Sequence, residues 1–290
     1  MSKQGKIILY PNAQRDIGFV MTRRVGDMLR KKGKQVVCCP VFENDANTFV
    51  TLPDIETAII EDELPSAEMI ITFGGDGTIL RAARAVANIG VPILGVNLGG
   101  KGFIAELEAG DIALIEKAVT DKFDIENCMM LDIEAVRDDM SFCRNFALND
   151  VVIKGDNKVI DLMLFGDGQR ISHFSGDGAV ISTPTGSTAY SMAAGGPIVE
   201  PAAHNIIVTP ICAHTLEAKS FVLIPNRRVS VEIGYRKRNP AYMSVDGGQH
   251  ISLQSGDVIN VCKSDRYARL VRLSKRSFYK KVSEKLGERP

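Results

Sequence analysis

The sequence has no tryptophan, no net charge, and only six cysteines and four histidines. No two cysteines form a CxxC pair and the histidines are scattered, so we expect neither a zinc site nor a disulfide framework, and a reducing cytoplasm is the expected location. No apolar run approaches the roughly 18 residues of a membrane span. The chain starts with a short apolar segment that does not resemble a signal peptide. These features predict a globular protein with no membrane partner.

The neutral charge argues against a nucleic-acid partner, because general polyanion binders carry a basic excess. The charges are nevertheless divided along the chain: residues 221–290 hold 15 basic and six acidic side chains, and acidic side chains predominate before them. One explanation is a basic tail for a nucleic acid or a membrane. Apolar residues interrupt the basic stretch throughout, which favours two folded regions with complementary charge.

The first third of the chain alternates strand-like and helix-like segments. Short apolar runs predict buried strands, and apolar residues at helical spacing between them predict helices. Strand, helix and strand at this spacing indicate a parallel sheet with helical crossovers. The predicted strands are 6–10, 35–39, 68–73 and 91–96, and the predicted helices are 78–88 and 112–119, with another between Val20 and Gly33.

From about residue 130 to residue 262, strand-like runs dominate, and turns with Gly, Asp, Asn or Pro separate them. Residues 166–168 (GDG) and 245–248 (VDGG) have the composition of hairpin turns. These features predict an all-β second domain, a sandwich or a related stack. The expected organisation is an α/β domain (1–127), a β-sandwich domain (128–264) and a basic C-terminal segment (265–290) that packs back on the first domain.

The strongest motif is FGGDGT at Phe73–Thr78, which follows a predicted strand and opens a predicted helix. Glycines let the backbone approach a phosphate closely, and a helix start favours anions. The aspartate would repel phosphate, so we expect it to hold Mg²⁺, to accept a proton from a hydroxyl nucleophile or to contact a sugar. The motif matches neither the Walker A pattern nor the GxGxxG fingerprint. The alternative is a turn in which the acid caps the helix.

Three further segments have the features of ligand-binding loops. Residues 97–103 (NLGGKGF) follow the next strand, and Phe103 would stack there on a flat ligand. Residues 182–191 (STPTGSTAYS) are rich in hydroxyl groups and carry no charge, which suits a polyhydroxylated ligand. Asn149 and Asp150 would contact a base edge and a ribose hydroxyl. The plainer alternatives are a turn with a core phenylalanine, a loop without function, and a simple turn.

Taken together, these motifs resemble those of the NAD kinases. The resemblance rests on GGDGT at 74–78, NLGxxGF at 97–103, LND at 148–150, DG at 177–178, STPTGSTAYS at 182–191, AGGP at 194–197, PIC at 210–212, HTL at 214–216 and VDG at 245–247. It implies an enzyme that uses ATP and Mg²⁺ to phosphorylate the 2′-hydroxyl of the adenosine ribose of NAD, giving NADP. It also implies a Rossmann-like first domain, a β-sandwich second domain and NAD between them. A neighbouring subunit of a homodimer or homotetramer would complete the site.

The resemblance also implies roles for individual residues. Asp76 would be the catalytic proton acceptor, and no metal ligand from the protein is expected. The backbone and side chains that would face the phosphates of ATP are Gly74, Gly75, Gly77 and Thr78. The expected NAD-binding residues are Asp76, Gly77, Phe103, Asn149, Asp150, Ser175, Asp177, Thr185, Thr188, Ala189, Tyr190, Ser191, Ala193, Cys212, Asp246 and Gln249.

The sequence departs from the family pattern at a few positions. Gly100 and Lys101 stand where His-Leu is common, Asp150 stands where Glu is common, and Ala193 stands where Ser is common. The motifs leave two other functions open: a kinase of the same GGDGT type that acts on a sugar phosphate or a lipid, and a dinucleotide sensor without turnover. They also leave open whether the donor is ATP, another nucleotide or polyphosphate, and whether NAD or NADH is preferred.

Overall fold

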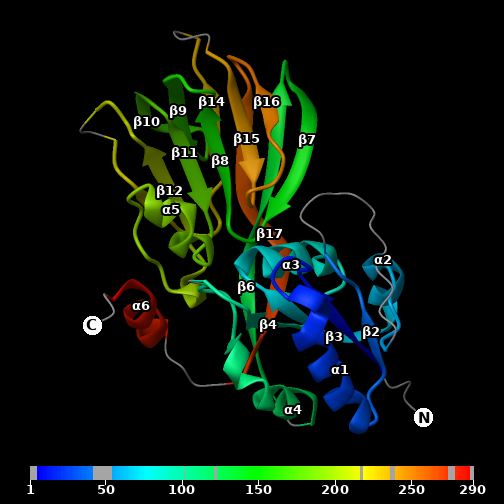
Figure 1. The fold of residues 1–290 in the computed structure, drawn as a ribbon. Helices are drawn as coiled ribbons and strands as arrows, with labels where there is room; N and C mark the ends of the chain where they lie inside the picture. The colour runs from blue at the N-terminus through cyan, green and yellow to red at the C-terminus, as the bar shows by residue number, and fades with distance from the viewer. Residues whose placement is uncertain are drawn as a thin grey trace. The chain divides into compact units, whose positions relative to one another are not determined.

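The computed structural model describes residues 5–41, 54–100, 102–120, 123–215, 218–235, 239–273 and 278–287 (Figure 1). The chain divides into two compact units, one formed by Met1–Asn127 with Ala268–Pro290 and the other by Cys128–Tyr267. The chain thus returns to the first unit at Ala268, whereas the sequence places this return at 265. Within the described ranges, no helix is long and apolar enough to cross a membrane.

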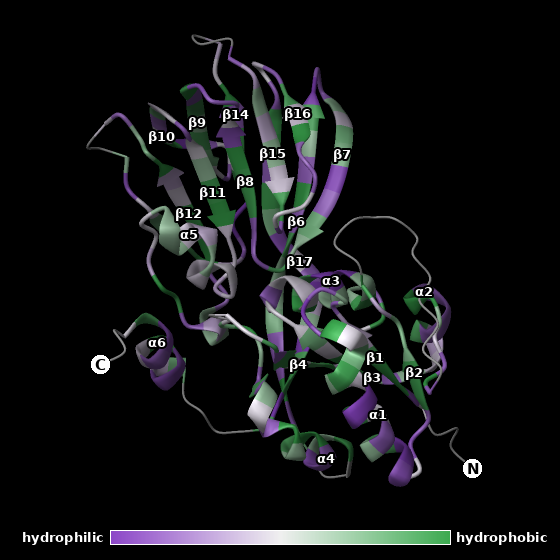
Figure 2. Cartoon of the chain, in the orientation of Figure 1, coloured by the Kyte–Doolittle hydropathy of each residue, from purple (hydrophilic) through white to green (hydrophobic). Residues whose placement is uncertain are grey.

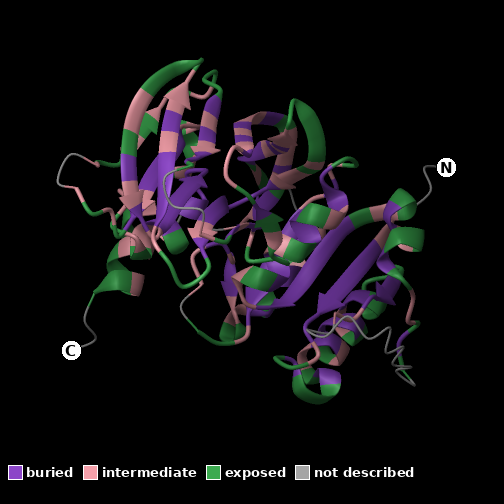
Figure 3. Ribbon diagram, turned by 90° about the horizontal axis from the view of Figure 1, so that it is seen from above, coloured by how far each residue is buried: buried purple, intermediate pink, exposed green. Residues whose placement is uncertain are grey.

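The first unit is built on a parallel sheet. Its strands are β1 (Lys6–Pro11), β2 (Val36–Cys38), β3 (Ala67–Gly74), β4 (Ile93–Asn97) and the short β5 (Leu107–Glu108). They are ordered β2–β1–β3–β4, and β4 also pairs with β5 and with Leu270 near the end of the chain. The central strands are buried along almost their whole length (Figure 3), which is typical of a parallel sheet and explains their continuous apolar runs.

Amphipathic helices pack on this sheet. They are α1 (Val20–Lys31), the short α2 (Ile60–Glu63), α3 (Asp76–Val86) and α4 (Ala113–Thr120). A further helix, α6 (Phe278–Leu286), follows near the end of the chain and has no buried residue. Val25 and Leu29 of α1 lie four residues apart and both enter the core, while hydrophilic residues alternate with them along the helix (Figure 2). The predicted helices are confirmed, but α3 begins at Asp76, two residues earlier than expected. The 3-10 turns are η1 (Ile17–Phe19), η2 (Leu64–Ser66) and η3 (Ala109–Asp111).

The second unit contains two sheets. The strands of the first sheet are β6 (Asp124–Arg137), β7 (Met140–Ala147), β9 (Ile160–Gly166), β10 (Gln169–Gly176), β14 (Val229–Ile233) and β17 (Val258–Arg272). The second sheet has six strands in the order β13–β12–β11–β8–β15–β16, all antiparallel. These strands are β8 (Asp150–Gly155), β11 (Gly178–Ser182), β12 (Ile206–Ile211), β13 (Phe221–Leu223), β15 (Ala241–Val245) and β16 (Ile251–Leu253).

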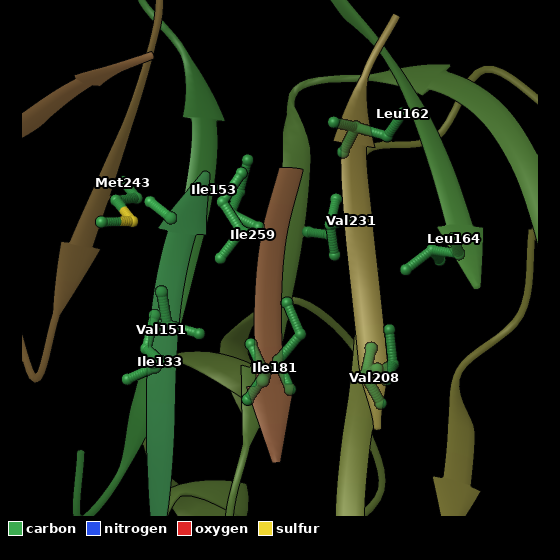
Figure 4. Packing of buried hydrophobic residues seen from close by; sticks show 14 of the residues in the cluster. Ile133, Val151, Ile153, Leu162, Leu164, Ile181, Val208, Val231, Met243 and Ile259 are labelled. Carbon is green, nitrogen blue, oxygen red and sulfur yellow. The ribbon is translucent and has the colours of Figure 1, made fainter. Parts of the chain in front are cut away.

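The inner faces of these two sheets form one apolar core (Figure 4). Because side chains alternate between the two faces of a strand, every second residue enters this core. Val151 and Ile153 of β8 follow this rule, and so do Leu162 and Leu164 of β9. Other core members, from both sheets, are Ile133, Ile181, Val208, Val231, Met243 and Ile259. The sandwich expected from the sequence is confirmed.

Both predicted hairpin turns are present. Asp167 and Gly168 connect β9 to β10 with φ of 50° and 79°, and Asp246 and Gly247 follow β15 with φ of 48° and 68°. Positive φ at both central residues is the geometry for which Asp-Gly is favoured. The extent of the strands was predicted less well, because β17 continues to Arg272, beyond residue 262, where the strand-rich region was expected to end. Its charged residues find acidic partners along the strand, which composition alone does not reveal.

Candidate active site

Asp76 connects the two glycine-rich segments of the first unit. β3 and β4 are parallel neighbours paired up to Gly74 and Asn97, so the loops after them leave the sheet at one edge. Asp76 is the first residue of α3. Its two carboxylate oxygens accept backbone N–H groups from the loop after β4, that of Phe103 at 2.8 Å and that of Ile104 at 3.2 Å. The two segments singled out in the sequence therefore meet at Asp76.

The glycines around Asp76 have different surroundings. A Cβ added at Gly74 would lie 2.2 Å from Oγ1 of Thr78, so this position needs glycine for close packing. Thr78 itself is buried, with 3% of its surface exposed. No described atom lies within 4 Å of a Cβ added at Gly75 or Gly77. These two glycines border open space at the start of α3, where an anion would meet the positive end of the helix dipole.

The carboxyl group of Asp76 is under two opposing influences. Burial raises its pKa above the ordinary value, and this is the largest effect. The backbone N–H groups of residues 103–105 lower the pKa, and the positive charge of Lys285 adds a smaller effect in the same direction. The net result is a raised pKa. A carboxylate with a raised pKa is a better proton acceptor at neutral pH than an exposed one.

The loop after β4 is held in place by Asn97. Its side-chain Nδ2 donates to Oε2 of Glu108 at 2.8 Å and to the carbonyl of Gly100 at 3.1 Å. Phe103, expected to stack on a ligand, is half-buried beside Asp76. Lys101, at which the sequence departs from the family pattern, lies outside the described residues.

A second polar cluster lies at one edge of the six-stranded sheet. In this sheet Asp150 of β8 pairs with Ser182 of β11, and Val151 pairs with Val245 of β15. The loop after β11 and the turn after β15 therefore begin beside the start of β8. Three segments that are far apart in the sequence, at 148–150, 183–193 and 246–249, are brought together at this edge.

Asp246 organises the start of β8. Its carboxylate accepts the backbone N–H groups of Leu148 at 2.8 Å, Asn149 at 2.7 Å and Asp150 at 3.1 Å. The left-handed backbone of the Asp-Gly turn directs the side chain back toward β8. In return, the N–H of Asp246 donates to the carbonyl of Asp150 at 3.0 Å. A carboxylate that binds three N–H groups stabilises the conformation of the segment that carries Asn149.

Asn149, Asp150 and Ser182 bury polar side chains at this edge of the sheet. Burial is the larger and the negative charge of Asp246 the smaller of two causes that together raise the pKa of Asp150 to about 7. The Oδ1 atom of Asn149 and the Oγ atom of Ser182 are buried, and neither has a hydrogen-bond partner among the described residues. Because unpaired buried polar atoms are rare and costly, this edge of the sheet has the features of a binding site for a polar ligand.

The hydroxyl-rich loop after β11 contains η4 (Gly186–Thr188) and α5 (Tyr190–Ala193). Several of its hydroxyl groups bind the protein itself. Thr183 donates to the carbonyl of Leu148 at 2.6 Å, and Ser187 donates to that of Pro184 at 2.6 Å. These buried hydroxyls hold the loop against the start of β8, a structural role that the sequence does not distinguish from ligand contact.

Ser191, expected to bind NAD, also has a partner within the protein, because its hydroxyl lies 2.9 Å from that of Thr209. Thr188, another of the expected residues, donates to the carbonyl of Thr185 at 3.1 Å. Tyr190 is 37% exposed, and Ala189 is half-buried. The surface of this loop is therefore formed by Thr188, Ala189 and Tyr190.

The chain matches both domains of one known protein family. The ATP-NAD kinase N-terminal domain matches residues 12–123, and the ATP-NAD kinase C-terminal domain matches residues 148–273. The NAD kinase of Acetivibrio thermocellus is 37% identical over 288 residues, covering 98% of each chain. The NAD kinase of Ruminiclostridium cellulolyticum is 33% identical over 287 residues, again covering 98% of each chain. The chain belongs to the NAD kinase family.

Solved structures share the fold of this NAD kinase family member. The yeast NADH kinase complexed with NADH has a TM-score of 0.84 at 23% identity, and the match covers 99% of this chain and 88% of that chain. An NAD kinase from Archaeoglobus fulgidus in complex with ATP has a TM-score of 0.73 at 24% identity, covering 97% and 98% of the two chains. At such identities the similarity establishes the architecture, an α/β domain followed by a β-rich domain.

Three other residues that were expected to bind NAD lie away from Asn149. Asp177 and Cys212 lie at the opposite end of β11, which spans Gly178 to Ser182, so roughly 13 Å of strand separates them from Asp150. Ser175 lies at the same end, and its hydroxyl donates to Asp161. Two further expected residues are exposed and lie at the same end of the sheet as Asn149. Ala193 is the last residue of α5, and Gln249 follows the Asp-Gly turn.

Some residues of the site lie outside the motifs identified in the sequence. The backbone N–H of Ile104 binds Asp76, and that of Ala105 lowers its pKa, although neither residue belongs to a motif identified in the sequence. Lys285 in α6 adds positive charge beside Asp76. The basic composition of the last residues was the only signal for this lysine, and it did not indicate where α6 packs.

Proposed function

We propose that this protein is an NAD kinase, which transfers the γ-phosphoryl group of ATP to the 2′-hydroxyl of the adenosine ribose of NAD. One observation carries the proposal: a buried carboxylate, that of Asp76, is held by backbone N–H groups beside a glycine loop that opens a helix. A ribose hydroxyl needs a proton acceptor, and a triphosphate needs nearby backbone N–H groups and open space. Family membership supports the same activity.

In the proposed reaction, the ribose O2′ forms a bond to the γ-phosphorus while the bond from that phosphorus to the β–γ bridging oxygen breaks. Asp76 accepts the proton of the hydroxyl, and ADP leaves with the electrons of the broken bond. The two N–H bonds use only part of the acceptor capacity of the carboxylate, so an oxygen lone pair is available for this proton. Because the phosphoryl transition state is loose, the main task of the protein is positioning.

The described residues fit a divalent cation that arrives with the nucleotide. They contain no group of three or more His, Cys, Asp or Glu side chains that would hold a metal ion by itself. Mg²⁺ commonly keeps several waters and binds through substrate phosphates with few protein ligands. The open side of Gly75 and Gly77 leaves space for phosphates that carry such an ion. When bound, the cation would offset the negative charge of the phosphates.

The cluster at Asn149 suits the adenosine part of NAD. The unpartnered Oδ1 of Asn149 accepts hydrogen bonds, which matches an exocyclic amine, and the carboxylate of Asp150 matches a ribose hydroxyl. Thr185, Thr188, Ala189 and Tyr190 would line the dinucleotide alongside. Asp246 would act through the backbone of residues 148–150.

We also propose a homo-oligomer whose neighbouring subunit completes the NAD site. The supporting observation is the placement of Ser175, Asp177 and Cys212 at the far end of β11 from Asn149. Within one copy of this unit, a single ligand would have to span the length of the strand to reach both ends. Light scattering combined with size exclusion would give the subunit number, and a monomer at the assay concentration would contradict this arrangement.

A cytoplasmic location is proposed from the sequence alone.

One assay separates the proposed function from its rivals. The purified protein is incubated with NAD, ATP and Mg²⁺, and NADP is detected with an NADP-specific dehydrogenase. We expect NADP to accumulate in proportion to enzyme and time. Binding of NAD without NADP formation would instead identify a sensor, and the absence of NAD binding would favour a kinase for a sugar phosphate or a lipid.

The pKa of Asp150 predicts how stability depends on pH. Because its folded-state pKa is about 7, against an ordinary value of 3.8, the folded protein binds more protons than the unfolded chain between these values. The contribution of Asp150 to the free energy of unfolding therefore falls as pH rises from about 4 to about 7 and levels off above. Asp150→Asn removes this dependence. We expect the Tm of Asp150→Asn minus that of the wild type to increase from pH 5 to pH 8. A difference that stays constant across this range would contradict the raised pKa.

A further inference from the structure

The 102–106 loop, which holds Asp76, is also hydrogen-bonded to the C-terminal segment. The N–H groups of the loop point at Asp76, as described above, and its carbonyl groups bind cations from the end of the chain. Nη1 of Arg272 donates to the carbonyl of Ile104 at 3.0 Å, and Nζ of Lys281 in α6 donates to that of Ala105 at 3.1 Å. The peptide backbone of this loop therefore lies between the catalytic carboxylate and two positive side chains.

A buried carboxylate, Glu106, fastens the C-terminal segment to the loop. Its side chain is 2% exposed, and its Oε2 atom lies 3.5 Å from Arg272 and 3.7 Å from Lys281. Its Oε1 atom accepts the backbone N–H of Leu273 at 3.1 Å. Two cations and an N–H group thus contribute to compensating the buried charge, and removing one of them would reduce this compensation.

The two sides of the loop are electronically coupled. The carbonyl of Ile104 and the N–H of Ala105 belong to the same peptide group. A guanidinium that binds the carbonyl oxygen polarises this group and strengthens the effect by which its N–H lowers the pKa of Asp76. The loop also packs closely against the carboxylate, because a Cβ added at Gly102 would lie 2.7 Å from Oδ1 of Asp76.

We infer that Arg272 and Lys281 are positioning residues for Asp76: they hold the 102–106 loop so that its N–H groups fix the carboxylate that accepts the ribose proton. The inference rests on the proposed function, and it adds to that function two residues of the C-terminal segment. Neither side chain contacts Asp76 through a hydrogen bond of its own. Both act through the backbone of the loop.

The charges around Asp76 determine the direction of the expected pH effect. The cations are Lys281 and Lys285 of α6 and Arg272 of β17, and the anions are Glu106, Glu108 of β5 and Glu126 of β6. Removing the positive charge of Lys281 leaves Glu106 with less compensation near Asp76. Both the lost charge and a looser loop then raise the pKa of Asp76. The acid limb of the kcat–pH profile moves to higher pH.

The test compares Lys281→Met with Lys280→Met, a matched control on the same helix. Lys280 is 63% exposed and lies 3.8 Å from Glu284 of the same helix. For Lys281→Met we expect kcat to fall about tenfold, the KM for NAD to stay within about twofold, and the acid limb to rise by about half a pH unit or more. Lys280→Met should match the wild type in all three. A wild-type kcat and acid limb in Lys281→Met would overturn the inference, as would a kcat that falls only in proportion to lost folded protein.

A second pair of variants tests the inference even if Lys281→Met does not fold. Arg272→Lys keeps the charge and a donor, whereas Arg272→Met removes both, so the acid limb should lie nearer the wild type in Arg272→Lys. An equal shift in both variants would count against the coupling through the carbonyl of Ile104.

A readout without turnover separates this inference from the proposed function. The ¹³C resonance of the Asp76 carboxyl group, assigned by its absence in Asp76→Asn, is titrated in wild type and Lys281→Met. We expect a higher pKa for Asp76 in the variant. Failure of the wild type to form NADP rejects the kinase function, whereas equal titration curves reject the positioning role alone.

Discussion

Asp76→Asn lowers kcat by at least about a hundredfold, the scale of losing a general base. The amide of asparagine cannot accept the proton of the ribose hydroxyl, although its oxygen can still accept the N–H of Phe103. The fold should persist, because the variant removes a buried charge whose pKa is raised by desolvation. The measurement is the steady-state rate of NADP formation at saturating NAD and ATP, with circular dichroism and Tm as checks of folding.

The control for this variant is Asp27→Asn. Asp27 lies on α1, is 59% exposed and pairs with Arg30 at 3.5 Å on the surface. We expect this variant to retain the wild-type kcat and a Tm within about 3 °C of the wild type. If Asp76→Asn also turned over at a rate near that of the wild type, Asp76 would not be the proton acceptor.

Gly186→Ala destabilises the second unit by about 3 kcal/mol. A Cβ at this position would lie 2.1 Å from the carbonyl oxygen and 2.6 Å from the carbonyl carbon of Asn149, and both atoms belong to the backbone. Asn149 cannot rotate away, because its N–H is bound by Asp246 and its carbonyl accepts the N–H of Thr183 at 2.8 Å. The clash therefore displaces the start of β8. We expect Tm to fall by about 6–12 °C and the KM for NAD to rise.

Gly110→Ala is the matched control for this clash. Gly110 lies in η3, and no described atom comes within 4 Å of a Cβ added there. Its Tm should stay near that of the wild type. A Gly186→Ala protein with both wild-type Tm and wild-type KM would contradict the close packing of the hydroxyl-rich loop on Asn149.

The glycine loop that carries Asp76 could be predicted from the sequence because its features are local. A glycine run after an apolar strand defines both the turn and the start of α3, and Asp76 falls within it. The meeting of Asp76 with Phe103 also followed from order along the chain, since the ends of neighbouring parallel strands lie at one edge of a sheet. Strand-like runs separated by turn residues likewise indicated the all-β second domain.

The roles of the hydroxyl groups could not be predicted in this way. Thr183, Ser187 and Ser191 have the same side-chain chemistry as a ligand-binding residue. The partners of Thr183 and Ser191, Leu148 and Thr209, are far away in the sequence, and only the pairing of β8, β11 and β12 brings them close. The raised pKa of Asp150 has the same origin, because it needs burial in the sheet and the approach of Asp246.

The sequence by itself therefore determined the family motifs, the order of the two domains, the glycine loop and the identity of its carboxylate. These depend on residues close together in the chain, whose spacing sets the backbone conformation. Only the tertiary structure decided which polar groups are satisfied within the protein, which remain unpartnered at Asn149 and Ser182, and how Arg272 and Lys281 hold the loop at Asp76. Hydrogen bonding and desolvation depend on distances of a few ångströms between segments that the chain order does not place together.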